Sequence, residues 1–188
     1  MTKFEEAAEF ALKAHEGMMR KRAQTPYILH PFEVASIAAT MTSNEDVLCA
    51  ALLHDVVEDT EMTLDEVRAE FGDRVAELVA SETEEKYPEL PSSETWWKRK
   101  SDSIQELRDS DDREVHILWL SDKLSNMRSF ARLHEKQGDD LWKHFHESDP
   151  AKQAWYYRAI RDATSDLSET AAWREYDFLV QLVFEGVN

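Results

Sequence analysis

Apolar side chains recur every three to four residues along most of this 188-residue chain, the period of an α-helix with one buried face. The first such stripe runs over residues 3–16, and the next begins at Pro31, a residue suited to the first turn of a helix. The same spacing predicts further helices at about 44–57, 63–72, 73–85, 94–109 and 112–135, and closing helices after Pro150. The alternating pattern of a half-buried strand is absent from the sequence.

Residues that interrupt helices are scarce, with four glycines and five prolines in the whole chain. Those present fall where the apolar pattern stops, as at Gly72, which follows a helix opened by the capping-box sequence Thr63-Leu64-Asp65-Glu66. The chain is long enough for one domain with a substantial core and short for two. We therefore expect one all-α domain over residues 1–188, a bundle of about 8–10 helices.

The charge balance narrows the range of partners. The chain carries 39 acidic and 22 basic residues, for a net charge of −17, which argues against a nucleic acid or an anionic membrane as partner. Any anionic ligand would need basic residues gathered locally. The sequence has no apolar run long enough to span a bilayer and no recognisable secretory signal, so we expect a cytoplasmic protein. Whether the chain forms a homo-oligomer stays open.

The stretch AALLHDVVEDT, residues 50–60, joins an apolar run to a histidine and three carboxylates. Residues four apart share a helix face, so a continuous helix would stack His54 on Glu58 and Asp55 on Asp59. Carboxylates are disfavoured at the C-terminal end of a helix and costly beside a core. Either water at a solvated helix end or a bound divalent cation could compensate them, and this stretch alone does not decide between the two.

Two further polar residues lie in apolar surroundings. His30 follows the apolar approach YIL just before a predicted helix start, and Asp122 interrupts the apolar face of the helix at 112–135, with Asn126 one turn later. Two histidines and two aspartates would suit Mn, Fe or Zn better than Ca or Mg, which prefer oxygen ligands throughout. The basic triplet Arg20-Lys21-Arg22 precedes His30 and could either bind phosphate or aid solubility.

Taken in order, these motifs resemble those of the HD-domain alarmone hydrolases, a family that includes the hydrolase half of RelA/SpoT-type proteins and small stand-alone relatives. The similar segments are AHEGMMRKRAQTPYILHP, HPFEVA, LLHDVVEDT with the following TLDEVRAEFGDRVAELV, and LSDKLSNMRS. They extend over about two thirds of the chain, to at least Arg128. The resemblance implies one HD-type metal-dependent phosphohydrolase domain, with a family-like core over about 1–135 and a divergent helical tail over about 139–188.

The resemblance also implies roles for individual residues. Its metal would be Mn²⁺, with another divalent transition metal left open, and the ligands would be His30, His54, Asp55 and Asp122. Glu58 and Asp59 would act in the reaction itself, by positioning and deprotonating the attacking water.

The implied substrate is a small anionic nucleotide, and Arg20, Lys21 and Asn126 fall where the family holds it. The implied reaction is hydrolysis of the 3′-pyrophosphate of ppGpp-like nucleotides, which yields a nucleoside diphosphate and pyrophosphate.

The sequence departs from the family pattern mainly on the substrate side. Met18-Met19 and the stretch Ser81-Glu82-Thr83-Glu84-Glu85-Lys86 differ from it, so the preferred base and phosphate pattern stay open. One alternative is an HD phosphohydrolase that acts on a different nucleotide or phosphoester, and another is a catalytically silent nucleotide-binding module. The cluster Lys98-Arg99-Lys100 could add positive charge to a site or be an exposed helix face.

Overall fold

Helices account for the regular structure of the chain in a computed structural model, which describes residues 1–20, 24–84, 87, 89–145 and 147–187. The α-helices are α1 (Lys3–Ala14), α2 (Leu29–Ala38), α3 (Glu45–Leu53), α4 (Val56–Asp59), α5 (Leu64–Phe71), α6 (Asp73–Glu82), α7 (Ser92–Asp109), α8 (Arg113–Gln137), α9 (Pro150–Ala163) and α10 (Ala171–Val183). Two 3-10 helices are η1 (Gly138–His144) and η2 (Ser165–Leu167). The predicted all-α bundle is confirmed for these residues, whose one β-type pairing is an isolated bridge between Met19 and Pro26.

Local sequence determines where several helices begin and end. The Thr63 hydroxyl accepts a hydrogen bond from the amide of Glu66, and the Glu66 carboxylate accepts one from the amide of Thr63, which forms the predicted capping box of α5. Gly72 separates α5 from α6 with φ +88°, a conformation that favours glycine. Asp149 caps α9, and Pro150 occupies its first turn.

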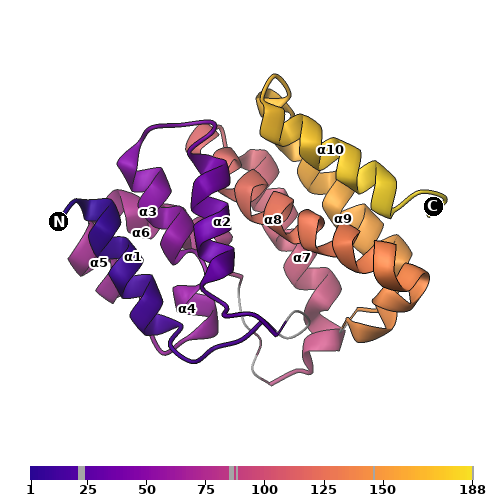
Figure 1. The fold of residues 1–188 in the computed structure, drawn as a ribbon, viewed down its shortest axis with the longest axis horizontal. Helices are drawn as coiled ribbons and strands as arrows, with labels where there is room; N and C mark the ends of the chain where they lie inside the picture. The colour runs from indigo at the N-terminus through magenta and orange to yellow at the C-terminus, as the bar shows by residue number, and fades with distance from the viewer. Residues whose placement is uncertain (21–23, 85–86, 88, 146, 188) are drawn as a thin grey trace.

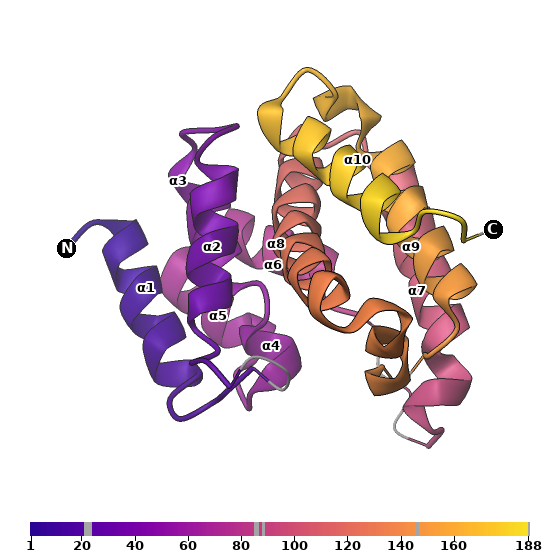
Figure 2. The same cartoon turned by 45° about the vertical axis from the view of Figure 1, so that its right-hand side comes forward.

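The long helix α8 lies at the centre of the molecule. It contacts α2, α3 and α6 on one side and α9 and α10 on the other, and the two chain ends lie at opposite ends of the bundle (Figures 1 and 2). The apolar face of α8 is fully buried at Leu118, Leu120, Leu124 and Met127. Burying a side chain of this size typically contributes about 1.5–3 kcal/mol, so α8 is held rigidly among its neighbours.

The predicted helix at about 44–57 is divided in the structure. α3 ends at Leu53 and α4 begins at Val56, with Asp55 between them at φ −93° and ψ −6°. A regular helix would direct adjacent side chains about 100° apart. Here His54 Nε2 and Asp55 Oδ2 lie 2.9 Å apart, because the break turns both side chains to the same side.

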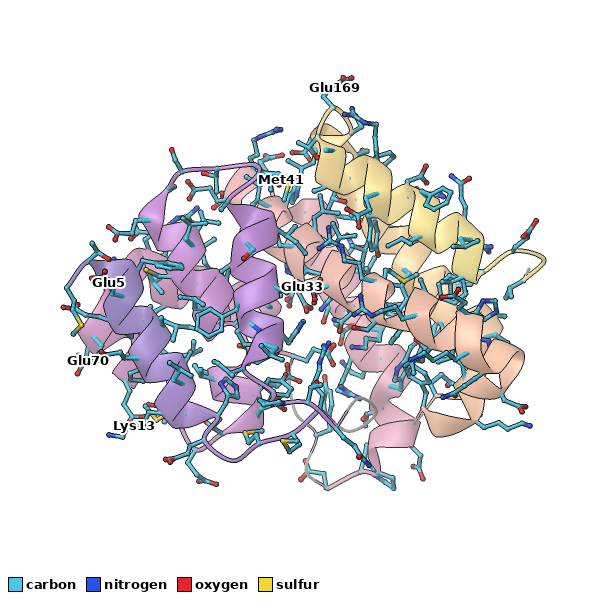
Figure 3. The ribbon with its side chains drawn as sticks, in the orientation of Figure 1. Glu5, Lys13, Glu33, Met41, Glu70 and Glu169 are labelled. Atoms are coloured by element: carbon cyan, nitrogen blue, oxygen red, sulfur yellow. The ribbon has the colours of Figure 1, made fainter. Side chains whose placement is uncertain are left out.

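A line of ion pairs connects the N-terminal helices to the C-terminal one through α8. Arg128 of α8 donates to Glu33 Oε1 at 3.1 Å and to the two carboxylate oxygens of Glu175 on α10 at 2.6 and 2.7 Å. Figure 3 shows Glu33 beside α8, whereas Glu5 and Glu169 lie at the periphery. Among the described helices, none combines the length and apolar character needed to cross a membrane.

Candidate active site

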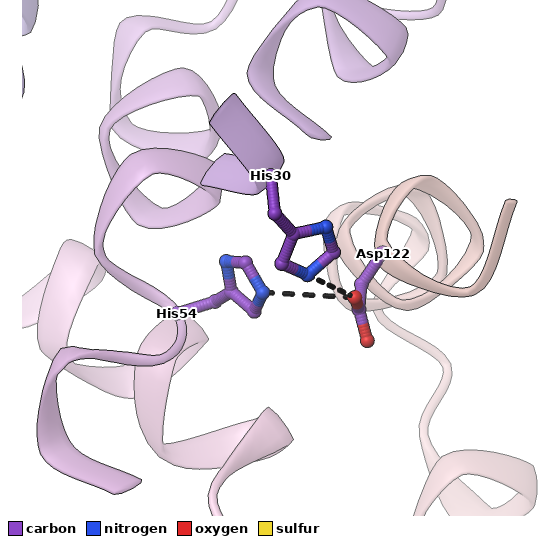
Figure 4. A group of neighbouring side chains, drawn as sticks. All are labelled: His30, His54 and Asp122. Carbon is purple, nitrogen blue, oxygen red and sulfur yellow. Dashed lines mark ion pairs between the residues drawn. The ribbon is translucent and has the colours of Figure 1, made fainter. Parts of the chain in front are cut away.

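Three segments distant in sequence bring polar side chains together inside the bundle. His30 lies in the first turn of α2, His54 directly follows α3, and Asp122 lies in the middle of α8 (Figure 4). Asp122 Oδ1 lies 3.0 Å from His30 Nε2 and 3.6 Å from His54 Nε2. All three side chains are buried, and one ligand atom from each lies within 4.8 Å of the others. The carboxylate of Asp122 therefore faces two imidazoles rather than water.

Asp55 joins this group from the break between α3 and α4. Its Oδ2 atom lies 2.9 Å from His54 Nε2 and 3.5 Å from His30 Nε2. The hydroxyl of Tyr27 donates to the same oxygen at 2.6 Å. All four ligand residues expected from the sequence thus meet in one place, whereas Tyr27 was not expected to act there.

Hydrogen bonds orient both imidazoles toward the centre of the cluster. His30 Nδ1 lies 2.9 Å from the hydroxyl of Ser125, which itself donates to Glu33 Oε2 at 2.8 Å. Because that hydroxyl hydrogen is committed to Glu33, His30 Nδ1 must be the donor, and Nε2 is left as the free ligand atom. His54 Nδ1 donates to the carbonyl oxygen of Ala51 at 2.9 Å. Metal-binding histidines are commonly held in this way.

The electrostatics of the cluster fit a divalent cation. Burial opposes the imidazolium form of His54, yet the carboxylates of Asp55 and Asp122 raise the pKa of His54 well above its usual 6.5. Burial likewise favours the neutral acid at Asp122, yet Lys123 and the two imidazoles lower the pKa of Asp122. His54 Nε2 is buried and lies 2.9 Å from Asp55 Oδ2, but it is in hydrogen-bond geometry with no atom of the described residues. Two imidazole nitrogens and two carboxylates suit a transition-metal ion.

A cavity of about 210 Å³ opens beside the four residues. Four cations line it, namely Arg20, Arg99, Lys100 and Lys123. Arg99 and Lys100 form ion pairs with Glu84, and Lys123 forms one with Asp122. The basic cluster Lys98-Arg99-Lys100 of α7 is therefore divided. Arg99 and Lys100 add positive charge to the cavity, whereas Lys98 is exposed and pairs with Asp102.

The two acids expected to act in the reaction lie on different sides of this region. Glu58 lines the cavity beside His54 and Asp55. Burial, helped by the carboxylates of Glu84 and Asp55, raises the pKa of Glu58 to about 7. Asp59 instead lines an adjoining cavity of about 510 Å³.

The residues expected to hold the substrate are connected to the cluster. Arg20 Nη2 donates to Asn126 Oδ1 at 3.1 Å, and Asn126 Nδ2 donates to Asp122 Oδ1 at 2.9 Å. Arg20 and Asn126 line both cavities. Lys21 lies outside the described residues.

Glu82 is a further acid in the first cavity that sequence reasoning did not identify as functional. It is only 7% exposed, and neither carboxylate oxygen has a hydrogen-bond partner among the described residues. Lys123 Nζ lies 3.9 Å away, and burial raises the pKa of Glu82 to about 7. The sequence period could have identified Glu82 as a buried acid, because Glu82 continues the buried stripe of Val75, Leu78 and Val79 on α6.

This chain is similar to known sequences over most of its length. A family model described as an HD domain matches residues 7–147. A guanosine-3′,5′-bis(diphosphate) 3′-pyrophosphohydrolase of Homo sapiens is 42% identical over 130 residues, which cover 68% of this chain and 69% of that protein. A protein of the same activity from Aquifex aeolicus is 34% identical over 142 residues, which cover 73% of this chain and 19% of that longer protein.

Solved structures are similar over most of the chain. A metazoan orthologue of SpoT, described as hydrolysing ppGpp, has a TM-score of 0.77 at 25% identity, covering 100% of this chain and 98% of that one. The protein lmo0812 of Listeria monocytogenes has a TM-score of 0.72 at 36% identity, covering 83% of this chain and 99% of that one. These similarities confirm the resemblance inferred from the motifs.

The raised pKa of His54 predicts that metal binding displaces a proton. His54 is protonated near neutral pH in the metal-free protein and must lose that proton to become a ligand. Binding of Mn²⁺ at about pH 7 should therefore release about one proton, measured by titration calorimetry in buffers of different ionisation enthalpy. Asp122→Asn should bind Mn²⁺ at least about tenfold more weakly, whereas His134→Asn, outside both cavities, should not. Equal affinity in Asp122→Asn would contradict the site.

The buried carboxylate of Glu82 predicts a pH-dependent effect on stability. Its pKa is about 7 in the folded, metal-free protein against 4.5 ordinarily, so stability falls as the pH rises between these values. The Glu82→Gln variant has no carboxyl group at this position, so it does not lose stability in this way as the pH rises. Its free energy of unfolding, relative to the unsubstituted protein, should rise by about 1–3 kcal/mol from about pH 5.5 to about pH 8 in urea denaturation.

Glu61→Gln is the matched control for this experiment, because Glu61 is exposed and lines neither cavity. It makes the same substitution without removing a buried carboxylate. The effect of Glu61→Gln on the free energy of unfolding should stay constant over that interval. A constant effect of Glu82→Gln as well would show that Glu82 does not titrate there.

Proposed function

The chain belongs to the HD-domain family, and we propose that it hydrolyses the 3′-pyrophosphate of guanosine 3′,5′-bis(diphosphate), giving a nucleoside diphosphate and pyrophosphate. One observation carries this proposal. The buried cluster of His30, His54, Asp55 and Asp122 opens into a cavity lined by cations, in a chain whose net charge is −17. A cation-binding cluster beside gathered positive charge is suited to an anionic phosphate ester.

His30, His54, Asp55 and Asp122 would hold the metal, for which we propose Mn²⁺. A bound divalent cation would neutralise charge on a phosphoryl oxygen and make an attacking water molecule more acidic. The relay from His30 through Ser125 to Glu33 keeps the imidazole in the required orientation.

We infer that the cations of the first cavity bind the pyrophosphate. Lys100 and Lys123 are half-buried, and each is paired with an acid, Glu84 and Asp122 respectively. Arginine and lysine side chains held by a neighbouring carboxylate keep a defined position before the substrate arrives. The pyrophosphate would therefore meet preorganised positive groups, which is the main way proteins stabilise charge in phosphoryl transfer.

Glu58 is the proposed proton acceptor. A carboxylate with a pKa of about 7 exchanges protons at neutral pH far more readily than an ordinary glutamate. Asp59 faces the adjoining cavity, where its carboxylate also raises the pKa of Tyr27. We assign proton transfer to Glu58 and orientation of the nucleotide and water to Asp59 together with the hydroxyl of Tyr27.

A second candidate keeps this chemistry and changes the base. Met18 and Met19 line the larger cavity, and methionines provide an adaptable apolar wall with little hydrogen-bonding specificity. An adenine nucleotide with the same 3′-pyrophosphate could therefore occupy this site. Turnover of ppGpp and ppApp by the Mn²⁺-loaded protein, compared at equal concentration, distinguishes the two. A retained acid at Glu58 with a pKa of about 7 favours either enzyme over a silent binding module.

Removal of the proton acceptor gives a direct test of this mechanism. Glu58→Gln should lower kcat by about 10²–10⁴-fold while Mn²⁺ still binds. The activity of the unsubstituted protein should rise with pH as Glu58 loses its proton, with a midpoint below 7 because a bound divalent cation favours the carboxylate, and the variant should lack that rise. Release of pyrophosphate from ppGpp is the measurement.

Glu61→Gln is the matched control, because Glu61 is an exposed glutamate three residues later in the chain and lines neither cavity. It should retain full activity. Equal turnover in Glu58→Gln would overturn the role of Glu58, and absence of pyrophosphate release by the unsubstituted Mn²⁺-loaded protein would overturn the proposed function.

A further inference from the structure

The larger cavity continues the metal-side cavity along α8. Arg20, Tyr27 and Asn126 line both, and the larger one, of about 510 Å³, extends further to Arg132 and Lys136. At 1.5 Å per residue, the backbone of Arg132 lies about 15 Å along the helix from Asp122. Side chains on a helix lean toward its N-terminus, so the guanidinium of Arg132 reaches back toward the metal side.

Two guanidinium groups meet at the hydroxyl of Ser129. Arg20 Nη1 donates to Ser129 Oγ at 3.1 Å, and Arg132 Nη2 donates to the same oxygen at 3.1 Å. The two positively charged groups are thus within about 6 Å of one another, at which distance like charges repel appreciably. Lys136 adds a third positive charge one turn further along α8.

No carboxylate among the described residues forms an ion pair with Arg20, Arg132 or Lys136, and Asp59 is the one acidic side chain among the described residues that line this cavity. Acidic residues pair with cations elsewhere on α8, as Glu175 does with Arg128. In a chain with 39 acidic residues, it is unusual for one cavity to have three cations that form no ion pair with a described residue. Their arrangement is suited to an anion that comes from outside the chain.

The remaining lining residues indicate what that anion is attached to. Met18, Met19, Phe130 and Leu133 give the cavity an apolar wall. A volume of about 510 Å³ lies within the usual range for small-molecule sites, with apolar walls and few polar groups. A nucleoside that carries phosphate groups meets both requirements, because its base packs on apolar side chains and its phosphates accept from the arginine fork.

We propose that Arg132 and Lys136, together with Arg20, bind the phosphates at the 5′ end of the nucleotide and so make the enzyme select nucleotides phosphorylated at both the 3′ and the 5′ positions. This inference rests on the proposed function, which places the 3′-pyrophosphate at the His30–Asp122 cluster. Arg132 and Lys136 bind the substrate without contacting the bond that breaks. Their loss therefore changes KM rather than kcat, and only for nucleotides that carry 5′-phosphates.

The test compares two substrates in two variants of the Mn²⁺-loaded full chain. The substrates are guanosine 3′,5′-bis(diphosphate) and guanosine 3′-diphosphate, which lacks the 5′-phosphates. Arg132→Gln and Lys136→Gln should each raise KM for the first substrate by about tenfold, with kcat nearly unchanged. KM for the second substrate should change by less than about twofold. Arg132 and Lys136 are both exposed, so these substitutions should leave the fold intact, which the melting temperature checks.

Arg108→Gln is the matched control, since Arg108 is an exposed arginine of α7 that lines neither cavity. It removes the same charge and should leave both KM values unchanged. An equal KM change for both substrates in Arg132→Gln, or no change for either, would overturn the inference while leaving the proposed function standing.

Binding of guanosine 5′-diphosphate separates the two failures. If the unsubstituted protein hydrolyses neither substrate, the proposed function fails, and calorimetry with guanosine 5′-diphosphate then judges the 5′-phosphate site by itself. Weaker binding to Arg132→Gln than to Arg108→Gln would support that site. Equal binding to the two variants, or no binding to the unsubstituted protein, would overturn it.

Discussion

The buried carboxylate of Asp122, facing two imidazoles from other parts of the chain, is the constraint on which this structure depends. An ionised group in a core costs several kcal/mol unless charge and hydrogen bonds compensate it. Lys123, the next residue on α8, supplies part of this compensation, and the rest comes from His30 of α2 and His54 at the end of α3, which approach the middle of α8. The apolar contacts of these helices position the polar cluster, and the cluster in turn explains why a carboxylate is tolerated there. We propose that a divalent cation completes the arrangement.

One face of α8 connects this cluster to the rest of the site. Asp122 accepts from Asn126, Asn126 accepts from Arg20, and Arg20 shares the hydroxyl of Ser129 with Arg132. The members on α8 lie about one helical turn apart, so the period of the helix fixes the distance from the metal cluster to the far end of the larger cavity. A rigid, buried helix can hold these groups at a fixed distance from one another.

Much of the fold was predictable because local signals agree with the final structure. The Thr63 capping box and Gly72 give helix ends from neighbouring residues alone. Asp122 could be identified as a candidate site residue because it is a charged residue that interrupts an apolar helix face, which is visible in the local sequence. The motif resemblance added the assignment of ligands, and the structure brings all four of those residues together. Whether they bind Mn²⁺ stays a proposal.

Other features depend on tertiary contacts that periodicity does not contain. The break at Asp55 replaces a predicted continuous helix, and it is this break that turns Asp55 toward His54. The donation from Tyr27 to Asp55 and the meeting of Arg20 with Ser129 join residues far apart in sequence. Glu82 carried the same anomaly as Asp122, a charge on a buried stripe, and the same reasoning applied to α6 would have identified it.

The most direct measurement is anomalous diffraction at the manganese edge from crystals of the Mn²⁺-loaded protein. The expected result is a single strong peak among His30 Nε2, His54 Nε2 and the carboxylates of Asp55 and Asp122. A peak bound only by the acids Glu82 and Glu84, or the absence of any peak at the two histidines, would contradict a metal centre built on Asp122.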